Sequence, residues 1–157
     1  MQTDALIKEL RDARADLLSA LEAVTPESMT TPGLVGEWSG RELIAHLGYW
    51  AGHATELIHA VEGGRIDDVG EDEPPVDDIN ETVARIARDT DLAIVRRREA
   101  AAVEALVERL TALDPTLLAE RLPDGATLEE GIREDGASHY REHAAGLRSV
   151  LGETPRG

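Results

Sequence analysis

The stretch WSGRELIAHLGYW (residues 38–50) contains the start of a helix and the first histidine of the chain, His46. Ser39 and Glu42 have the spacing of a capping box, in which each side chain satisfies a free backbone amide of the first turn. The residues at helical spacing from this start share one face: Leu43, His46, Trp50, His53 and Leu57. Because that face is largely apolar, the sequence predicts that His46 and His53 lie on the buried side of this helix.

A second histidine motif, HYREH (residues 139–143), lies near the end of the chain. Two histidines four residues apart on a helix point the same way, one turn apart, so both imidazoles can reach a single divalent ion. Burying an imidazole nitrogen without a partner costs about 1–3 kcal/mol, so converging buried histidines need a common partner. We therefore predict a metal site formed by His46, His139 and His143, with a hydrogen-bonded core cluster as the alternative.

The histidines do not specify which metal they bind, and Zn, Ni, Fe and Mn all remain candidates, since imidazole accepts several first-row ions. No carboxylate ligand is evident, which disfavours the pattern of two histidines and one carboxylate that binds iron. Asp135 and Glu42 lie within a turn of the expected ligands and are candidates for orienting an imidazole. The alternative for both is a solvated or salt-bridged carboxylate.

The composition indicates one helical domain over residues 1–157. Hydrophobic residues make up 41% of the chain, but there is no Phe and there are only two Trp and two Tyr. Ala and Leu supply most of the apolar content and favour helix, whereas aromatic residues favour strands, so we expect an all-α core.

The charge and the termini restrict the expected partners. With 32 acidic against 16 basic residues the formal net charge is −16, which argues against nucleic acid, because a binder must offer Lys and Arg to phosphates. An anionic membrane surface is disfavoured for the same reason. No signal-peptide pattern and no run of 18 apolar residues occurs, so a cytoplasmic location without membrane association is expected. Cysteine is absent, so thiol chemistry would need an exogenous low-molecular-weight thiol.

Apolar periodicity predicts the main helices over residues 3–24, 39–62, 91–113 and 127–151, with a further helix from about 77–80 to 88. Whether residues 77–113 form one bent helix or two stays open, because Asp89-Thr90-Asp91 offers a break. The segment RIDDVGEDEPPVDD (65–78) holds seven acids and two adjacent prolines and is predicted to be a long acidic connection between the second and third helices.

The tryptophan before a helix start, the Ala-His-Leu that follows in WSGRELIAHL (38–47) and the late HYREH (139–143) together resemble the DinB-like superfamily. This resemblance implies a four-helix bundle with a His-His-His metal site. It also implies activities such as those of thiol-dependent transferases and isomerases, among them the maleylpyruvate isomerase relatives.

Four further residues are predicted to line a pocket at this site. Trp50 lies one turn after His46, and His53 lies two turns after it, about 10 Å along the helix axis, too far to share the ion. His53 is a candidate general base, and Tyr140 is expected to reach the mouth of the site. Asn80 is included because similar sequences often carry Asn there. The alternatives are core packing for Trp50, an ordinary partly buried histidine for His53 and a helix cap for Asn80.

Three functions remain possible from the sequence. The first is a metal-dependent enzyme, a thiol-dependent transferase or isomerase or a hydrolase, acting on a small electrophilic molecule. The bias toward Arg over Lys, with Lys8 the one lysine, and the abundance of Ala are typical of GC-rich genomes, so mycothiol is the first thiol to test. The alternatives are a non-catalytic metal-binding or stress-related module, and a structural bundle without metal. A homodimer is also expected to be possible.

Overall fold

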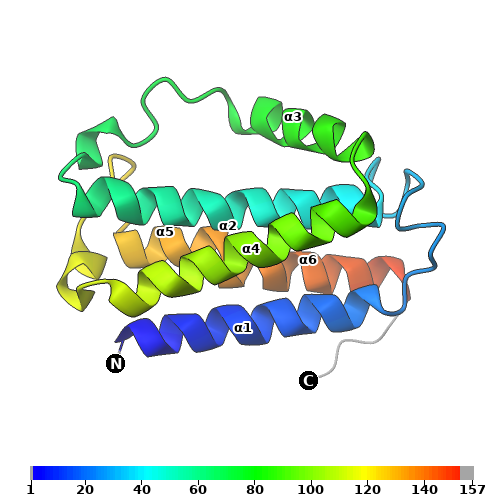
Figure 1. Ribbon diagram of the computed structural model, residues 1–157, viewed down its shortest axis with the longest axis horizontal. Coiled ribbons are helices and arrows are strands. Elements are labelled where there is room, and N and C mark those ends of the chain that lie inside the picture. The colour runs from blue at the N-terminus through cyan, green and yellow to red at the C-terminus, as the bar shows by residue number, and fades with distance from the viewer. Residues whose placement is uncertain (1, 153–157) are drawn as a thin grey trace.

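The computed structural model describes residues 2–152 and is a bundle of α-helices (Figure 1). The helices are α1 (Gln2–Leu21), α2 (Gly40–Glu62), α3 (Val76–Arg88), α4 (Leu92–Ala112), α5 (Leu128–Asp135) and α6 (Ala137–Val150), with short 3₁₀ helices η1 (Ile66–Asp68) and η2 (Pro115–Ala119). α5 and α6 follow one another along the same direction, so they form the fourth rod beside α1, α2 and α4. The predicted all-α bundle is thus confirmed.

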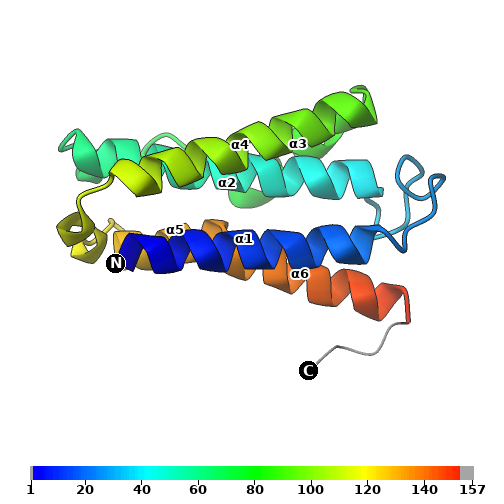
Figure 2. The same ribbon diagram turned by 60° about the horizontal axis from the view of Figure 1, so that its bottom comes forward.

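The bundle consists of two layers, with α2 and α4 in one and α1 with α5 and α6 in the other (Figure 2). Leucines from every rod fill the space between the layers and are almost fully buried, including Leu17, Leu43, Leu106 and Leu147. Burying a leucine side chain contributes about 1.5–3 kcal/mol, so this core accounts for the packing of the helices.

Both ends of the central helix α2 are formed by local interactions. Ser39 and Glu42 form the predicted capping box: the Glu42 amide donates to Ser39 Oγ over 3.4 Å, and the Ser39 amide donates to Glu42 Oε1 over 3.1 Å. Gly63 caps the far end. The predicted range of 39–62 is therefore confirmed, and the helix carries His46 at a defined place on its buried face.

Residues 77–113 form two helices, which resolves the question that the sequence left open. The chain turns at residues 89–91, between α3 and α4, and α3 lies outside the four rods against α2 (Figure 1). The acidic connection reaches α3 through η1 and passes over one side of α2. α3 and this connection therefore cover a side of α2 that the bundle leaves free.

The expectation of a single final helix over 127–151 was wrong, because the helix breaks at Gly136. The Gly136 amide still donates to the Ile132 carbonyl over 2.9 Å. A Cβ at Gly136 would lie only 2.9 Å from that same oxygen, so the break depends on a residue without a side chain. The break sets the start of α6 and hence the direction of His139, three residues later.

Candidate metal centre

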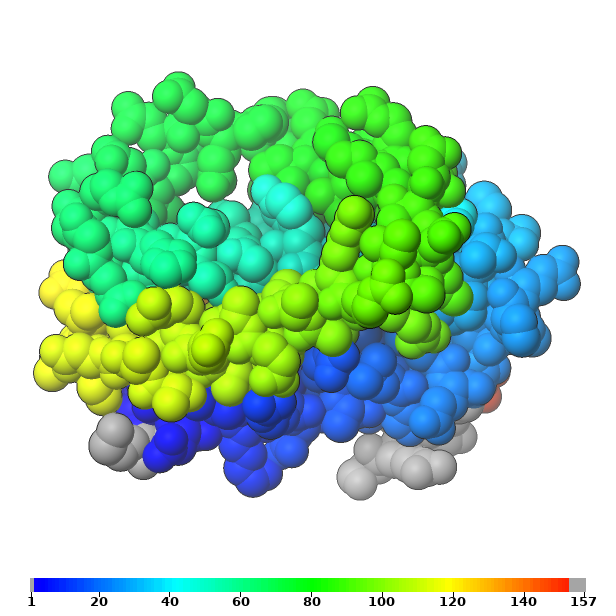
Figure 3. Space-filling model, viewed as in Figure 1, coloured from blue at the N-terminus to red at the C-terminus, as the bar shows by residue number. Residues whose placement is uncertain are grey.

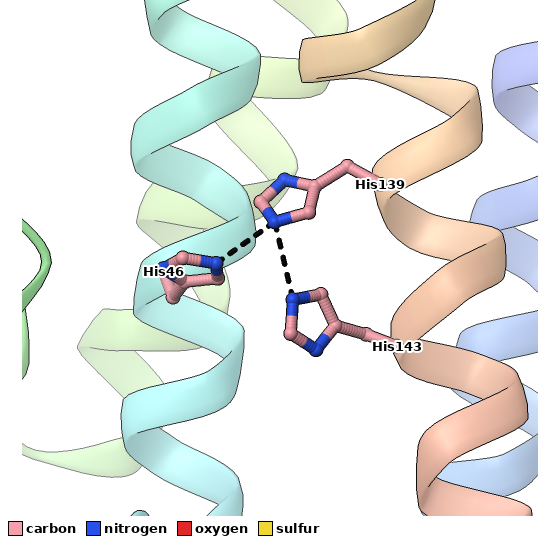
Figure 4. Close-up of side chains that lie close together, drawn as sticks. All are labelled: His46, His139 and His143. Carbon is pink, nitrogen blue, oxygen red and sulfur yellow. Dashed lines mark hydrogen bonds between the residues drawn. The ribbon is translucent and has the colours of Figure 1, made fainter. Parts of the chain in front are cut away.

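The three predicted histidines converge at one point between α2 and α6 (Figure 4). His46 Nε2 lies 2.8 Å from His139 Nε2, and His143 Nε2 lies 3.1 Å from the same atom. His46 is buried, with 5% of its surface exposed, and the other two are half-buried. The i, i+4 spacing on α6 therefore places two imidazoles toward the one that α2 supplies.

Hydrogen bonding among the rings explains this arrangement poorly. A neutral imidazole carries one N–H donor and one acceptor lone pair, which lies in the ring plane. His139 Nε2 faces two other nitrogens at once, and a single lone pair can point along only one of those directions. Three nitrogens bound to one ion at 2.0–2.1 Å would lie about 2.9–3.4 Å apart, depending on the angle at the metal. The two short spacings are close to this range, and all three ligand atoms lie within 4.8 Å of one another, so small shifts of the rings would allow shared coordination of a divalent ion.

The environment keeps the imidazoles neutral, as metal ligation requires. Burial, with smaller contributions from the charges of its two partners, lowers the pKa of His46 to about 3. Burial and the charge of His143 lower the pKa of His139 to about 4, whereas Glu142 and the main-chain carbonyl of Asp135 act in the opposite direction. Burial also lowers the pKa of His143. Each lone pair is thus free to bind a cation near neutral pH.

The second nitrogen of His46 has no hydrogen-bond partner among residues 2–152. His46 Nδ1 is buried, and the nearby Asn80 amide opposes the lowering of the His46 pKa but lies outside hydrogen-bond geometry. By contrast, the Asp135 carbonyl faces His139 and is placed to orient that ring. The Asp135 side chain itself pairs with His53 and not with one of the three clustered histidines. Glu42 instead completes the helix cap and accepts from Arg88 Nε over 2.9 Å.

A cavity of about 480 Å³ opens directly onto the three histidines. Its other walls are Trp38, Trp50, Val76, Asn80, Glu134, Asp135 and Glu142. A second cavity of about 360 Å³ continues along α2 toward His53 and shares Trp50, Val76, Glu134 and Asp135 with the first. Figure 3 shows the molecule hollowed between α2, α3 and the acidic connection, which border these cavities. An ion held by the three histidines would therefore face open space rather than packed side chains.

His53 lies in the second cavity and is held by two carboxylates. His53 Nδ1 is 2.6 Å from Asp135 Oδ2, and His53 Nε2 is 3.3 Å from Glu73 Oε1 on the acidic connection. Burial by itself would lower the pKa of His53, but the hydrogen bonds and charges of Asp135 and Glu73 outweigh it and raise that pKa. The two carboxylates thus shift the His53 pKa in the direction opposite to the shifts of the three clustered histidines, while burial raises the pKa of Asp135 itself.

The remaining pocket predictions have different outcomes. Trp50 and Asn80 both line the first cavity, and Trp50 Nε1 donates to Asn80 Oδ1 over 2.9 Å. The structure does not bring Tyr140 to the cavity: its side chain is fully buried, and its hydroxyl donates to Glu99 Oε2 over 2.9 Å. Glu99 in turn accepts from Arg14 at 2.6–2.9 Å, which links α1, α4 and α6 inside the bundle.

Several residues of the site were missed from the sequence. Trp38 lines the cavity with its ring centroid 4.8 Å from that of His46, and its place before the helix cap was the available signal. Asp135 was noted for its closeness to His139 in sequence, but the sequence did not indicate its pairing with His53. Nothing in the sequence pattern indicated Glu73, because a residue of an irregular connection has no periodicity to follow.

Fold and site together define a helical bundle with a three-histidine cluster that is suited to binding a metal ion. Residues 9–145 match the sequence model of the DinB superfamily, and the chain belongs to that superfamily. The resemblance found in the two histidine motifs is thus confirmed. A comparison with curated proteins found no match.

Two solved structures share this fold at low sequence identity. One is an uncharacterised protein from Escherichia coli UTI89, with 16% identity and a TM-score of 0.79 over 96% of this chain and 92% of that one. The other is the colibactin self-resistance protein ClbS in complex with a dsDNA, with 20% identity and a TM-score of 0.75 over 98% of this chain and 97% of that one.

The ClbS complex overturns the exclusion of nucleic acid that was drawn from the net charge of this chain. A protein of the same fold binds dsDNA, and the net charge of a chain sums over its whole surface, whereas a ligand meets only one part of it. Within residues 2–152, no helix has the length and apolar character needed to cross a membrane.

Proposed function

We propose that this protein is a metal-dependent enzyme that adds a nucleophile, water or a low-molecular-weight thiol, to a small electrophilic molecule. One observation carries the proposal: three imidazole Nε2 atoms converge on a point at the wall of a cavity of about 480 Å³. A structural metal site is closed by protein ligands, whereas a catalytic site keeps positions open. Among residues 2–152 the metal-binding cluster consists of only these three histidines, which leaves positions on the cavity side.

His46, His139 and His143 would hold the ion through their Nε2 atoms. When bound, a divalent ion supplies the positive charge that makes water or a thiol nucleophilic at neutral pH. Trp38 and Trp50 would form apolar walls that keep bulk water from the reacting groups. Because the chain has no cysteine, a thiol nucleophile would enter as a co-substrate, and mycothiol is the first to test.

His53 would hold and transfer a proton in the second cavity. Asp135 fixes its ring through Nδ1, and Nε2 is directed toward the exposed carboxylate of Glu73. Because its pKa is raised, His53 holds a proton more readily than the three clustered histidines, so it is suited to donate one to a leaving group or to a negative charge that develops on the substrate. Since His53 lies about 10 Å from His46 along α2, it would act on the part of the substrate remote from the ion.

The first test is metal content. Untagged protein purified without chelator is expected to hold close to one equivalent of a divalent metal, measured by mass spectrometry, and to lose it in His46→Ala and His143→Ala. His59→Ala is the matched control, because His59 lies on α2 outside both cavities and is expected to keep the metal. A wild type that takes up no Zn, Ni, Mn or Fe(II) on reconstitution would refute the proposal.

The second test is turnover. The metal-loaded protein is incubated with small electrophiles, with water alone or with mycothiol and other thiols, and product is followed by chromatography. We expect turnover that disappears in His143→Ala and falls in Asp135→Asn while that variant keeps its metal. Metal binding without turnover across the panel would favour the non-catalytic metal-binding module instead.

A further inference from the structure

The two cavities beside the histidines are adjacent along α2, since they share the side chains of Trp50, Val76, Glu134 and Asp135. We refer to the two together as the cleft. The histidine cluster lies at one end and His53 at the other, about 10 Å apart along the helix. The cleft is therefore long enough for a small molecule with a reactive end and a second, differently recognised end.

Apart from the divalent ion that the proposed function places on the three histidines, the cleft has no fixed positive charge available to a ligand. None of the residues that line either cavity is Lys or Arg. His53, the one histidine there with a raised pKa, is already held by Asp135 and Glu73. An anionic substrate, such as the dicarboxylate for which the maleylpyruvate isomerases are named, would therefore find no side-chain cation to bind.

Negative charge, by contrast, is free at the histidine end. Glu134 and Glu142 both line the first cavity, and within residues 2–152 neither forms a hydrogen bond or an ion pair. Glu142 directly precedes His143 on α6, whereas Glu134 lines both cavities, and both side chains are exposed. Glu142 is thus available to a ligand at the end with the metal-binding nitrogens, and Glu134 along the wall that the two cavities share.

Aromatic rings complete the recognition surface. Trp38 stands 4.8 Å from His46, and Trp50 stands 5.0 Å from His53, measured between ring centroids, so each end of the cleft has an indole wall. Indole faces attract organic cations through their negative quadrupole, and carboxylates beside them add charge attraction. His46 itself is only 5% exposed, so the indole of Trp38 and the carboxylates are the groups that a ligand would meet at this end.

We propose that the cleft selects a small organic cation, and that the substrate of the proposed enzyme is an electrophile with an amine or ammonium group on a compact apolar body. The cationic group lies between Glu134, Glu142 and the indole rings, while the electrophilic carbon faces the three histidines. This inference rests on the proposed function for the word substrate, but the selection of cations over anions is a property of the cleft itself and is tested by binding alone.

The test compares a cation with an anion of the same shape. Benzyltrimethylammonium and phenylmethanesulfonate are titrated into the full chain at low, constant ionic strength, with benzyl alcohol as the neutral reference. Trp38 and Trp50 are the only tryptophans of the chain and both line the cleft, so intrinsic fluorescence reports binding there. The cation is expected to bind at least about tenfold more tightly than the sulfonate, the size of effect that two nearby carboxylates produce.

Charge-neutral variants locate the effect. Glu134→Gln and Glu142→Gln are each expected to weaken the binding of the cation about two- to fivefold, the range for a partly solvated ion pair. Glu108→Gln makes the same change of net charge on the exposed side of α4 and is expected to leave cation binding unchanged. The inference is overturned by equal affinity for cation and sulfonate, by no saturable fluorescence change with the cation, or by an equal loss in Glu108→Gln.

Metal-free and Zn-loaded samples separate this inference from the proposed function. Cation binding that depends on Glu134 and Glu142 in a protein that takes up no metal would support the cation site and refute the metal-dependent enzyme. A protein that binds metal and turns over an electrophile, but titrates alike with cation and sulfonate, would refute the cation site and leave the enzyme standing.

Discussion

Substituting Gly136 by alanine tests how the helix break positions the candidate metal centre. A Cβ at Gly136 would lie 2.9 Å from the Ile132 carbonyl oxygen and 3.4 Å from Leu10 Cδ1. The first contact is with backbone of the preceding turn, which cannot rotate away as a side chain would. We therefore expect α5 and α6 to shift relative to each other, and His139 to move with the first turn of α6.

The magnitude follows from two opposing terms. Forcing an extra methyl group into a packed position costs about 1–3 kcal/mol. Replacing glycine by alanine reduces the entropy of the unfolded chain and returns about 0.4–1 kcal/mol. The net expectation is a loss of about 1–2 kcal/mol in the free energy of unfolding, or about 2–8 °C in Tm for a chain of this size. Displacing the His139 ring is expected to weaken metal affinity about 10- to 100-fold.

Gly146→Ala is the matched control, because Gly146 lies in α6 and a Cβ added there would have no atom within 4 Å. At this position the same substitution is expected to stabilise the protein by about 0.5–1 kcal/mol without changing metal affinity. Urea unfolding gives the stabilities, and competition with a chromophoric chelator gives the affinities. If Gly136→Ala were as stable as the wild type and bound metal equally well, the break would not position the site.

Three further predictions concern the buried ion pair, the packing of α2 on α4 and the protonation of the clustered histidines. Glu99→Ala leaves the Arg14 guanidinium, which is 25% exposed, without its carboxylate, and is expected to lower the free energy of unfolding by about 2–3 kcal/mol in urea titrations. Gly48→Ala would place a Cβ 3.0 Å from the Cα of Glu99, and is expected to cost about 1–3 kcal/mol by forcing α2 and α4 apart, measured by thermal unfolding. In metal-free protein the folded-state pKa values of His46 (about 3) and His139 (about 4) lie below their ordinary value of 6.5, so the fold resists their protonation. This contribution is present above pH 6.5 and is lost as pH falls toward 4, and urea unfolding across that range with chelator should show a smaller slope in His46→Leu.

The total charge of this chain is a poor guide to its binding partners. A net charge of −16 describes the whole chain, but binding depends on the potential at one surface. The acidic residues that make up this net charge also have different roles. Glu99 is paired inside the bundle, Glu42 caps a helix, and Glu142 lines the cavity. A residue count cannot separate these roles.

The inclusion of His46 in the site rested on its apolar helix face and on the family resemblance, whereas the helical class, the cap of Ser39 with Glu42 and the pair His139 and His143 were predictable from the local sequence pattern. These features follow local rules, since a capping box needs only residues three apart, and an i, i+4 pair defines one side of a helix. That is why Ser39 and Glu42 pair as predicted, and why His139 and His143 face the same way.

The tertiary structure alone decided which side chains meet across helices. Tyr140 lies between two of the histidines in sequence, yet it turns into the bundle to reach Glu99, 41 residues away. His53 meets Asp135 across 82 residues, and Glu73 approaches it from a connection without periodicity. The break at Gly136 likewise depends on how tightly Ile132 and its neighbours pack. Helical periodicity specifies the direction of a side chain but not its neighbour, because the neighbour is set by the packing of segments that are distant in the chain.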